Sequence, residues 1–144
     1  MNGSTDPVLY IERELVNQMI ANVESSPEEC CGFLFGHERD GRHITKIWAA
    51  SNATSGDKRK QFEIEPLEYL RAENHAAQND LELLGIYHSH PNHPAIPSEK
   101  DKAAAQPFFS YVILSVNQCK FASIRSWRLS NAGQFEEETI TTHL

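Results

Sequence analysis

The apolar residues between positions 12 and 24 recur three or four positions apart, which is the spacing of one face of a helix. The pattern stops at the Ser-Ser-Pro segment 25–27, because proline does not continue a helix. We therefore predict an amphipathic helix that begins at about Glu12. Its apolar face consists of Leu15, Val16, Met19, Ile20 and Val23.

The segments after this helix have the pattern of paired strands. Residues 30–36 are apolar and aromatic, and residues 43–50 alternate between apolar and polar before becoming fully apolar. Between them, Asp40-Gly41 is a typical turn sequence. These features predict a β-hairpin.

Polar and apolar segments then alternate along the middle of the chain. Residues 51–60 are polar and predict a loop, and residues 61–65 predict a short strand. Pro66 is tolerated in the first turn of a helix, and the following residues to Gln78 favour one. We expect loop, strand and helix in that order.

The last part of the chain is rich in strand patterns. Residues 81–90 read as a strand that is buried on both faces and becomes polar only at its C-terminal end. Residues 98–106 predict a brief helix that Pro107 stops. Two or three further strands are expected within 108–116, 120–130 and 134–140.

This order of elements defines the expected fold class. Helices and strands are mixed along the chain, there is no repeat, and no linker divides the sequence. A chain of 144 residues is large enough to bury one core without disulfides. We predict a single α/β domain, residues 1–144, in which helices flank a curved, mixed β-sheet.

The charge balance and the apolar runs exclude two classes of partner. Twenty acidic and thirteen basic residues give a formal charge of −7, and Lys58, Arg59 and Lys60 form the only dense basic cluster, so nucleic acid is not expected as the main partner. No apolar run reaches the roughly 20 residues that cross a bilayer, and the first ten residues lack the pattern of a signal peptide. We expect a cytoplasmic protein without membrane contact, of unspecified oligomeric state.

The three cysteines do not form a metal or disulfide pattern. Cys30 and Cys31 are adjacent, and Cys119 is distant. Their odd number and spacing match neither a disulfide framework nor a four-thiolate zinc site. We predict buried thiols within strands.

The segment 86–101, Ile-Tyr-His-Ser-His-Pro-Asn-His-Pro-Ala-Ile-Pro-Ser-Glu-Lys-Asp, carries the candidate chemistry. His88 and His90 end a predicted strand two residues apart, so both imidazoles project from the same face. Catalytic zinc takes three protein ligands, and Asp101 follows at the start of the next helix after a proline-rich return loop. This spacing predicts a zinc site. The histidine His93 is a weaker candidate for a ligand.

A structural explanation for Asp101 competes with the metal site. Ser98 is a good helix N-cap, and an acidic residue three positions later can close a capping box with it. Capping alone explains Ser98 and Asp101, but it does not explain two histidines that face the same way beside that helix.

The motif resembles the signature of the JAMM zinc metalloproteases, the catalytic branch of the MPN domains. Residues 88–101 match His-x-His-x7-Ser-x2-Asp at every fixed position. The segment Ser-Pro-Glu-Glu-Cys-Cys-Gly-Phe-Leu-Phe-Gly, residues 26–36, resembles the strand that follows the catalytic glutamate in small prokaryotic members. The resemblance spans nearly the whole chain and implies an MPN, cytidine-deaminase-like fold.

Carried over to this sequence, the resemblance implies a division of roles. His88, His90 and Asp101 would bind Zn²⁺, and Glu29 would act as the general base toward a water molecule. Ser98 would stabilise the oxyanion. Spacing alone does not separate Glu29 from its neighbour Glu28, so that choice rests on the family pattern.

The resemblance also implies a substrate class. Family members cleave amide or isopeptide bonds after the C-terminal tail of ubiquitin-like proteins, and small prokaryotic members resemble enzymes that act on sulfur-carrier proteins. The connection at 51–60 is short where eukaryotic deubiquitinases have a long insertion, which argues against linkage-specific deubiquitination. Two alternatives stay open: a non-catalytic MPN scaffold, and a metal hydrolase for small amides.

Overall fold

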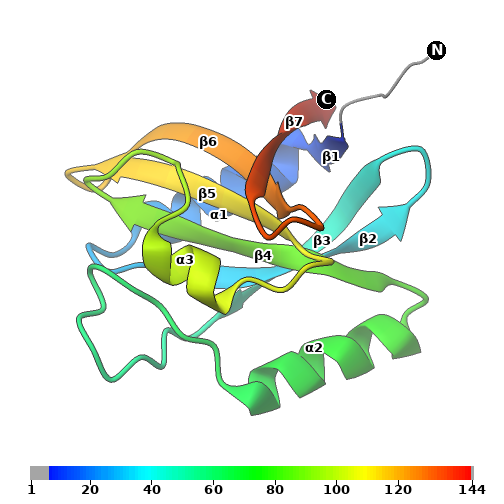
Figure 1. The fold of residues 1–144 in the computed structure, drawn as a ribbon, viewed down its shortest axis with the longest axis horizontal. Coiled ribbons are helices and arrows are strands. Elements are labelled where there is room, and N and C mark those ends of the chain that lie inside the picture. The colour runs from blue at the N-terminus through cyan, green and yellow to red at the C-terminus, as the bar shows by residue number, and fades with distance from the viewer. Residues whose placement is uncertain (1–6, 144) are drawn as a thin grey trace.

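The computed structural model describes residues 7–143, which form seven strands and three helices (Figure 1). The helices predicted near 12–24, 66–78 and 98–106, the hairpin and the later strands are confirmed. The elements in chain order are β1 (Val8–Glu12), α1 (Arg13–Glu24), β2 (Cys31–Glu38), β3 (Arg42–Ala50), α2 (Pro66–Gln78), β4 (Glu82–Pro91), α3 (Glu99–Ala104), β5 (Ser110–Asn117), β6 (Lys120–Leu129) and β7 (Phe135–His143).

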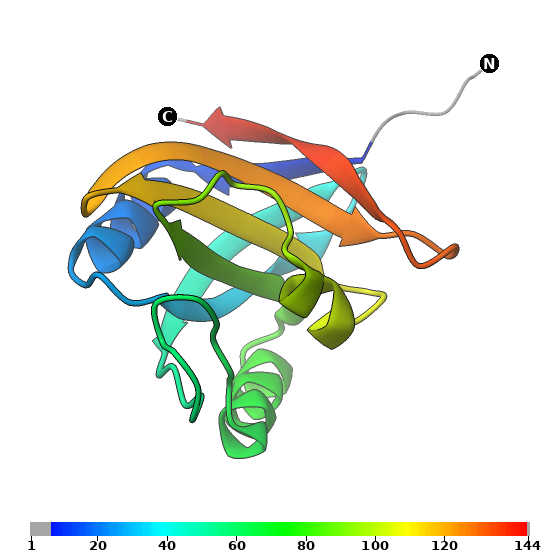
Figure 2. The same ribbon diagram turned by 60° about the vertical axis from the view of Figure 1, so that its left-hand side comes forward.

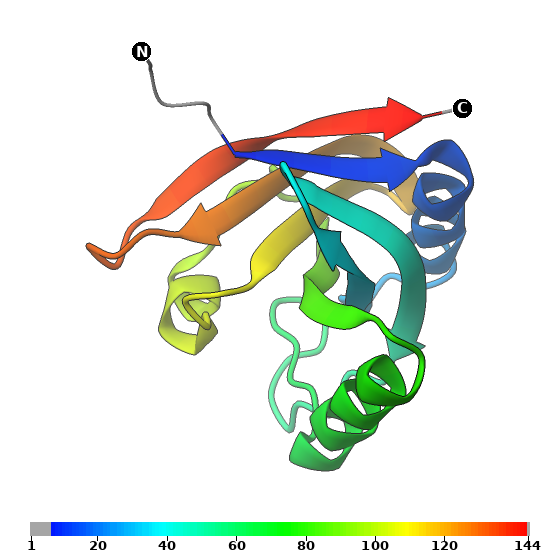
Figure 3. The ribbon, with the colours of Figure 1, turned by 90° about the vertical axis from the view of Figure 1, so that its right-hand side faces the viewer.

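The strands form a closed barrel in the order β1-β3-β2-β4-β5-β6-β7. The sheet is mixed, as predicted, because β1 pairs in parallel with both β3 and β7, and β4 pairs in parallel with β5. The prediction of a curved sheet was wrong in one respect, since the sheet closes on itself. Figure 3 shows β1 and β7 side by side where the barrel closes.

Two local predictions failed, each for a physical reason. The strand β1 was not foreseen, because its five residues pair with segments about 30 and 130 residues further along the chain. The strand predicted at 61–65 is absent from the described structure. There, Glu63 donates its backbone N–H to the Asn52 side chain (3.2 Å), and its carbonyl accepts from Ala53 N–H (2.8 Å). The Asn52 side chain thus takes the place of the backbone partner that a neighbouring strand would supply.

The predicted hairpin turn is formed as the sequence indicates. Asp40 has φ 51° and Gly41 has φ 109°, so both residues adopt left-handed conformations that Gly and Asp tolerate better than most residues. The turn joins β2 to β3 at the end of β2 that is far from Cys31.

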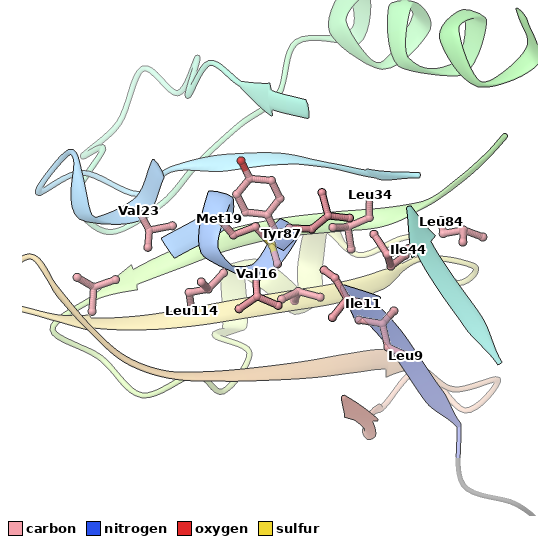
Figure 4. Close-up of a cluster of buried hydrophobic side chains, with 13 residues drawn as sticks. Leu9, Ile11, Val16, Met19, Val23, Leu34, Ile44, Leu84, Tyr87 and Leu114 are labelled. Carbon is pink, nitrogen blue, oxygen red and sulfur yellow. The ribbon is translucent and has the colours of Figure 1, made fainter. Parts of the chain in front are cut away.

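Two apolar layers lie on either side of β4, which explains why this strand is buried on both faces. One layer joins Tyr87 to residues of the other strands and to Val16 and Met19 of α1 (Figure 4). The other layer includes Ile86 and packs beneath Ala72 and Ala76 of α2. His88 and His90 follow Ile86 at intervals of two, so they emerge on the α2 side.

The α2 side of the barrel therefore carries the candidate chemistry. Figure 2 shows α2 and the loop at 51–65 on the side of the barrel opposite to β1 and β7, and α3 lies beside the strands β4 and β5. Among the helices of residues 7–143, none is long and apolar enough to span a membrane.

Candidate metal centre

The register between β2 and β4 positions Glu29 beside the two histidines. Cys31 is directly opposite His88, and the pairing continues beyond the end of β2 because Ser89 donates its N–H to Cys30 O (3.0 Å). The two segments run antiparallel, so two residues before Cys31 and two residues after His88 bring Glu29 opposite His90. Glu29 therefore lies on the face that carries His90. Strand pairing thus gathers three of the predicted site residues.

The helix α3 brings Asp101 to the same place. Asp101 N–H donates to Ser98 Oγ (3.1 Å), and Ser98 N–H donates to Asp101 Oδ2 (2.8 Å), which is the capping box that the sequence predicts. Asp101 Oδ2 also lies 3.0 Å from His90 Nε2, and Asp101 Oδ1 lies 3.7 Å from His88 Nε2. Capping and contact with the histidines therefore occur together, through different atoms and lone pairs.

The tautomer of neutral His90 follows from its partners. Nδ1 lies 2.9 Å from Pro94 O, and because a carbonyl only accepts, Nδ1 carries the hydrogen. A neutral ring then presents the lone pair of Nε2 to a carboxylate oxygen of Asp101. Two lone pairs in contact require a cation between them, either a proton or a metal ion.

The pKa values of this pair reflect burial and their mutual hydrogen bond. Burial lowers the pKa of His90, but the hydrogen bonds to Asp101 and Pro94 outweigh it and raise the pKa above its ordinary value. Burial raises the pKa of Asp101, but His90, His88 and the Ser98 N–H outweigh it and bring the pKa to about 2. Asp101 is therefore ionised at neutral pH.

His88 and Glu29 are buried with polar atoms that lack partners. His88 is 1% exposed, and burial lowers its pKa to about 4, so the ring is neutral at pH 7. Glu29 is 6% exposed, and burial raises its pKa to about 8 despite the opposing charge of His90. Within residues 7–143, neither ring nitrogen of His88 nor Glu29 Oε1 has a hydrogen-bond partner. Such orphaned atoms cost about 1–3 kcal/mol each.

These donors fit a zinc ion. One ligand atom each from Glu29, His88 and His90 lies within 4.8 Å of the others. Two ligands at 2.0–2.1 Å from one zinc ion in tetrahedral geometry lie roughly 3.3 Å apart. The contacts of Asp101 with His90 (3.0 Å) and His88 (3.7 Å) bracket that separation. The nitrogen and carboxylate donors are also those that zinc prefers.

The backbone of Glu29 is held by the loop at 51–65. Glu29 N–H donates to Lys58 O (2.7 Å), and Glu29 O accepts from Asn52 Nδ2 (3.1 Å). The same amide group of Asn52 donates to Gln61 O (3.0 Å), while Asn52 Oδ1 accepts from two backbone N–H groups of the loop. Sequence reasoning missed Asn52, because one asparagine in a polar loop carries no pattern.

Burial separates the two adjacent glutamates that spacing alone could not distinguish. Glu28 is exposed, whereas Glu29 is buried with its Oε1 atom 3.7 Å from His88 Nδ1. Glu29 is thus the one of the two that lies at the histidine cluster.

Two hollows flank this cluster. The smaller, about 270 Å³, is lined by His88 and Asp101 together with apolar and aromatic residues that include Phe62 and Tyr111. The larger, about 540 Å³, is lined by Glu29 and His90 among others. The ring of Phe62 packs on His88 with centroids 4.5 Å apart. The residues of the cluster thus line two hollows, His88 and Asp101 the smaller one and Glu29 and His90 the larger one.

Other residues that the sequence singled out lie nearby. Ser98 and His93 are exposed and line the larger hollow. Cys31 is buried in β2, and burial raises its thiol pKa to about 12, as predicted for an inert core thiol. Cys30 is half-buried just before β2, and Cys119 is exposed in the turn before β6, so the prediction of buried thiols within strands was wrong for both.

Comparison with known proteins identifies the class to which this fold and site belong. The family model described as prokaryotic homologs of the JAB domain matches residues 12–130. The chain therefore belongs to this family, and the resemblance to the JAMM/MPN domains is confirmed.

Particular relatives with assigned activities are similar over most of their length. The chain is 33% identical to the desampylase of Pyrococcus furiosus over 132 residues, 92% of this chain and 89% of the relative. It is 33% identical to the CysO-cysteine peptidase of Mycobacterium tuberculosis over 135 residues, 90% of this chain and 88% of the relative. The solution structure of a Desulfitobacterium hafniense protein superposes with a TM-score of 0.81 at 29% identity, covering 94% of this chain and 92% of that one.

Proposed function

We propose that this protein is a zinc-dependent metallopeptidase. It hydrolyses the amide or isopeptide bond that follows the C-terminal tail of a ubiquitin-like or sulfur-carrier protein. The observation that carries the proposal is the convergence of Glu29, His88, His90 and Asp101 between two hollows. The names of the relatives, a desampylase and a CysO-cysteine peptidase, support the same class of reaction.

The four side chains would divide into three ligands and one base. His88, His90 and Asp101 would hold Zn²⁺, and His90 is oriented for this by its bond to Pro94 O. A zinc ion there supplies Lewis acidity that makes water lose a proton near pH 7. Without a metal, burial raises the pKa of Glu29 to about 8 and keeps its side chain protonated at pH 7. The charge of a zinc ion beside it would lower that pKa, and the ionised carboxylate of Glu29 would then accept the proton of the water.

Bond cleavage then follows from the positions of Glu29 and Ser98. The oxygen of the deprotonated water attacks the carbonyl carbon of the scissile amide. The Ser98 hydroxyl donates its hydrogen to the oxyanion, which leaves its lone pair free to cap α3. Glu29 returns the proton to the leaving nitrogen as the C–N bond breaks.

The tail of the carrier protein binds in an extended conformation across the site, from one hollow to the other. Extended tails suit narrow clefts because main-chain hydrogen bonds supply affinity. The loop at 51–65 forms one wall through Gln61, Phe62 and Ile64. This loop is too short to grip a distal ubiquitin in the manner of a long insertion, so linkage-specific deubiquitination is not proposed.

The domain boundaries and the cellular location of the protein remain predictions. We infer one domain, residues 1–144, of which 1–6 and 144 lie outside the described residues. A cytoplasmic location and the absence of nucleic-acid and membrane partners are retained from the sequence.

The function is tested with zinc-loaded protein and a panel of ubiquitin-fold carriers that bear C-terminal cysteine or lysine adducts. Mass spectrometry should find the free carrier tail as product. Cleavage of free dipeptides but of no carrier would assign a small-amide hydrolase. Failure on every substrate, together with failure to bind zinc, would assign a scaffold.

A further inference from the structure

Two basic side chains line the mouth of the candidate site, and two more adjoin one of them in the sequence. We name Lys58, Arg59, Lys60 and Lys100 the basic rim, and all four are exposed. Lys60 and Lys100 line the larger hollow beside Glu29 and His90, and Lys100 also lines the smaller hollow. The rim is therefore part of the entrance to the site.

The backbone fixes the rim relative to the catalytic residues. Lys58 O accepts the N–H of Glu29 (2.7 Å), and Lys60 N–H and Gln61 N–H both donate to Asp57 O in a tight turn. Lys100, on α3, donates from Nζ to the Gln61 side-chain oxygen and so links α3 to the loop. The rim thus consists of two segments joined across the site.

Within the part of the chain that the structure describes, the cationic groups of the rim form no close ion pair, although the charge of Lys100 partly offsets the rise in the pKa of Glu29. Among residues 7–143, no ion pair involves Lys58, Arg59, Lys60 or Lys100. Two acidic residues lie close by. Asp57 Oδ1 accepts the backbone N–H of Arg59, and Glu99 pairs with Lys102 (3.1 Å). The rim keeps a local excess of positive charge in a chain whose formal charge is −7.

A positive patch on an otherwise acidic protein selects its partner by charge. The −7 charge repels nucleic acid at long range, whereas an acidic patch on a protein approaches the rim favourably. The rim lies beside the hollow that would receive a tail, so the partner's acidic patch must lie close to that tail.

We propose that the basic rim docks an acidic face of the carrier-protein substrate, next to the point where its C-terminal tail enters the site. This inference rests on the proposed function and names the substrate's surface chemistry. Rim charges of this kind accelerate association and are screened by salt, with a Debye length of about 8 Å at 0.15 M ionic strength.

The test neutralises the rim without changing the backbone or the metal ligands. The variant K58Q/R59Q/K60Q is compared with R13Q/R39Q/R71Q, which removes three exposed charges that line neither hollow. Each is assayed on a ubiquitin-fold carrier with acidic residues around its tail, and on a synthetic peptide of the tail alone. Both substrates carry the same C-terminal adduct.

The expected result is a loss that falls mainly on the protein substrate and only on the rim variant. The KM of K58Q/R59Q/K60Q for the carrier should rise about tenfold at low salt, whereas cleavage of the tail peptide should change much less, because only Lys60 of the three lines a hollow. Raising the salt concentration should bring wild type toward the variant. The control triple should match wild type.

Three outcomes would overturn the proposal. An equal loss on the tail peptide would mean that the segment shapes the cleft, and an equal loss in the control triple would mean that net charge alone matters. Rim-dependent binding of duplex DNA in place of the carrier would assign the rim to nucleic acid. If the wild type cleaves neither substrate, the proposed function fails. The rim is then tested by the affinity of the labelled carrier for the wild type and for the two triple variants, and equal affinity for all three would overturn the role of the rim.

Discussion

His90 and Asp101 approach to 3.0 Å between Nε2 and Oδ2, although eleven residues separate them in the chain. The opposite nitrogen of His90 donates to Pro94 O, and Oδ2 of Asp101 already accepts the Ser98 N–H. Both groups are therefore oriented by second partners, which is the arrangement that a metal site needs for rigid ligands. The proline-rich return loop and the capping box of α3 produce it.

The loop residue Asn52 should position Glu29 for catalysis. Replacing it by aspartate keeps its shape but turns its amide donors into an oxygen that faces the carbonyls of Glu29 and Gln61. We expect N52D to lower kcat about 10- to 100-fold per zinc-loaded molecule, because small displacements of a catalytic group are costly.

A matched control for this variant is Asn22, whose amide donates to the Tyr87 hydroxyl (2.7 Å) on the other face of β4. An aspartate there can accept the hydroxyl hydrogen, so N22D should retain kcat. Normal kcat in N52D, or an equal loss in both variants, would show that Asn52 has no special role toward Glu29.

The two roles of Ser98 can be separated by substitution with glycine. Glycine at an N-cap costs only a few tenths of a kcal/mol relative to serine, but it carries no hydroxyl. We expect S98G to lose about 100- to 1,000-fold in kcat, with little change in the free energy of unfolding. Measured turnover close to wild type would leave Ser98 with the capping role alone.

The metal-free protein should lose stability as the pH rises from about 4.5 to 8. Burial raises the pKa of Glu29 from 4.5 to about 8, so between these values the folded state holds a proton that the unfolded state has released. Stability from this group is complete below pH 4.5 and is lost as the pH rises toward 8. The raised pKa of His90 acts in the same direction above 6.5.

Urea unfolding of chelator-treated protein at pH 6.5 and pH 8 measures this effect. We expect the free energy of unfolding to fall by roughly 1–2 kcal/mol, and E29Q to show a smaller fall because its side chain does not titrate. An identical pH dependence in E29Q and wild type would remove Glu29 as its source.

The buried carboxylate of Glu138 should stabilise the pairing of β6 with β7. Glu138 is 1% exposed, accepts from Ser126 Oγ (2.6 Å) and pairs with Arg128 Nε (2.5 Å) across β6 and β7. Removing one partner of such a pair costs roughly 3 kcal/mol. We expect E138A to lose about that much in urea unfolding with unchanged zinc content. A loss near zero would show that this pair adds little to the pairing of β6 with β7.

The sequence predicted which residues meet at the candidate site but not the closure of the fold. His88 and His90 were placed by strand alternation, and Asp101 by its position at a helix start, because both depend on local periodicity. The β1 strand pairs with segments remote in sequence, and its five residues carry no signal of those partners. The segment 61–65 has strand composition, yet Asn52 supplies its partner atom, and no residue pattern encodes that contact.

The central claim is that Asp101, with His88 and His90, holds the metal while Glu29 moves the proton. It is tested most directly by zinc content and turnover in D101A and E29Q, after equilibration with buffered zinc. We expect E29Q to keep about one zinc per chain and to lose roughly 100- to 10,000-fold in kcat, while D101A loses the zinc. Zinc retained in D101A but lost in E29Q would contradict the account and assign the metal to Glu29, His88 and His90.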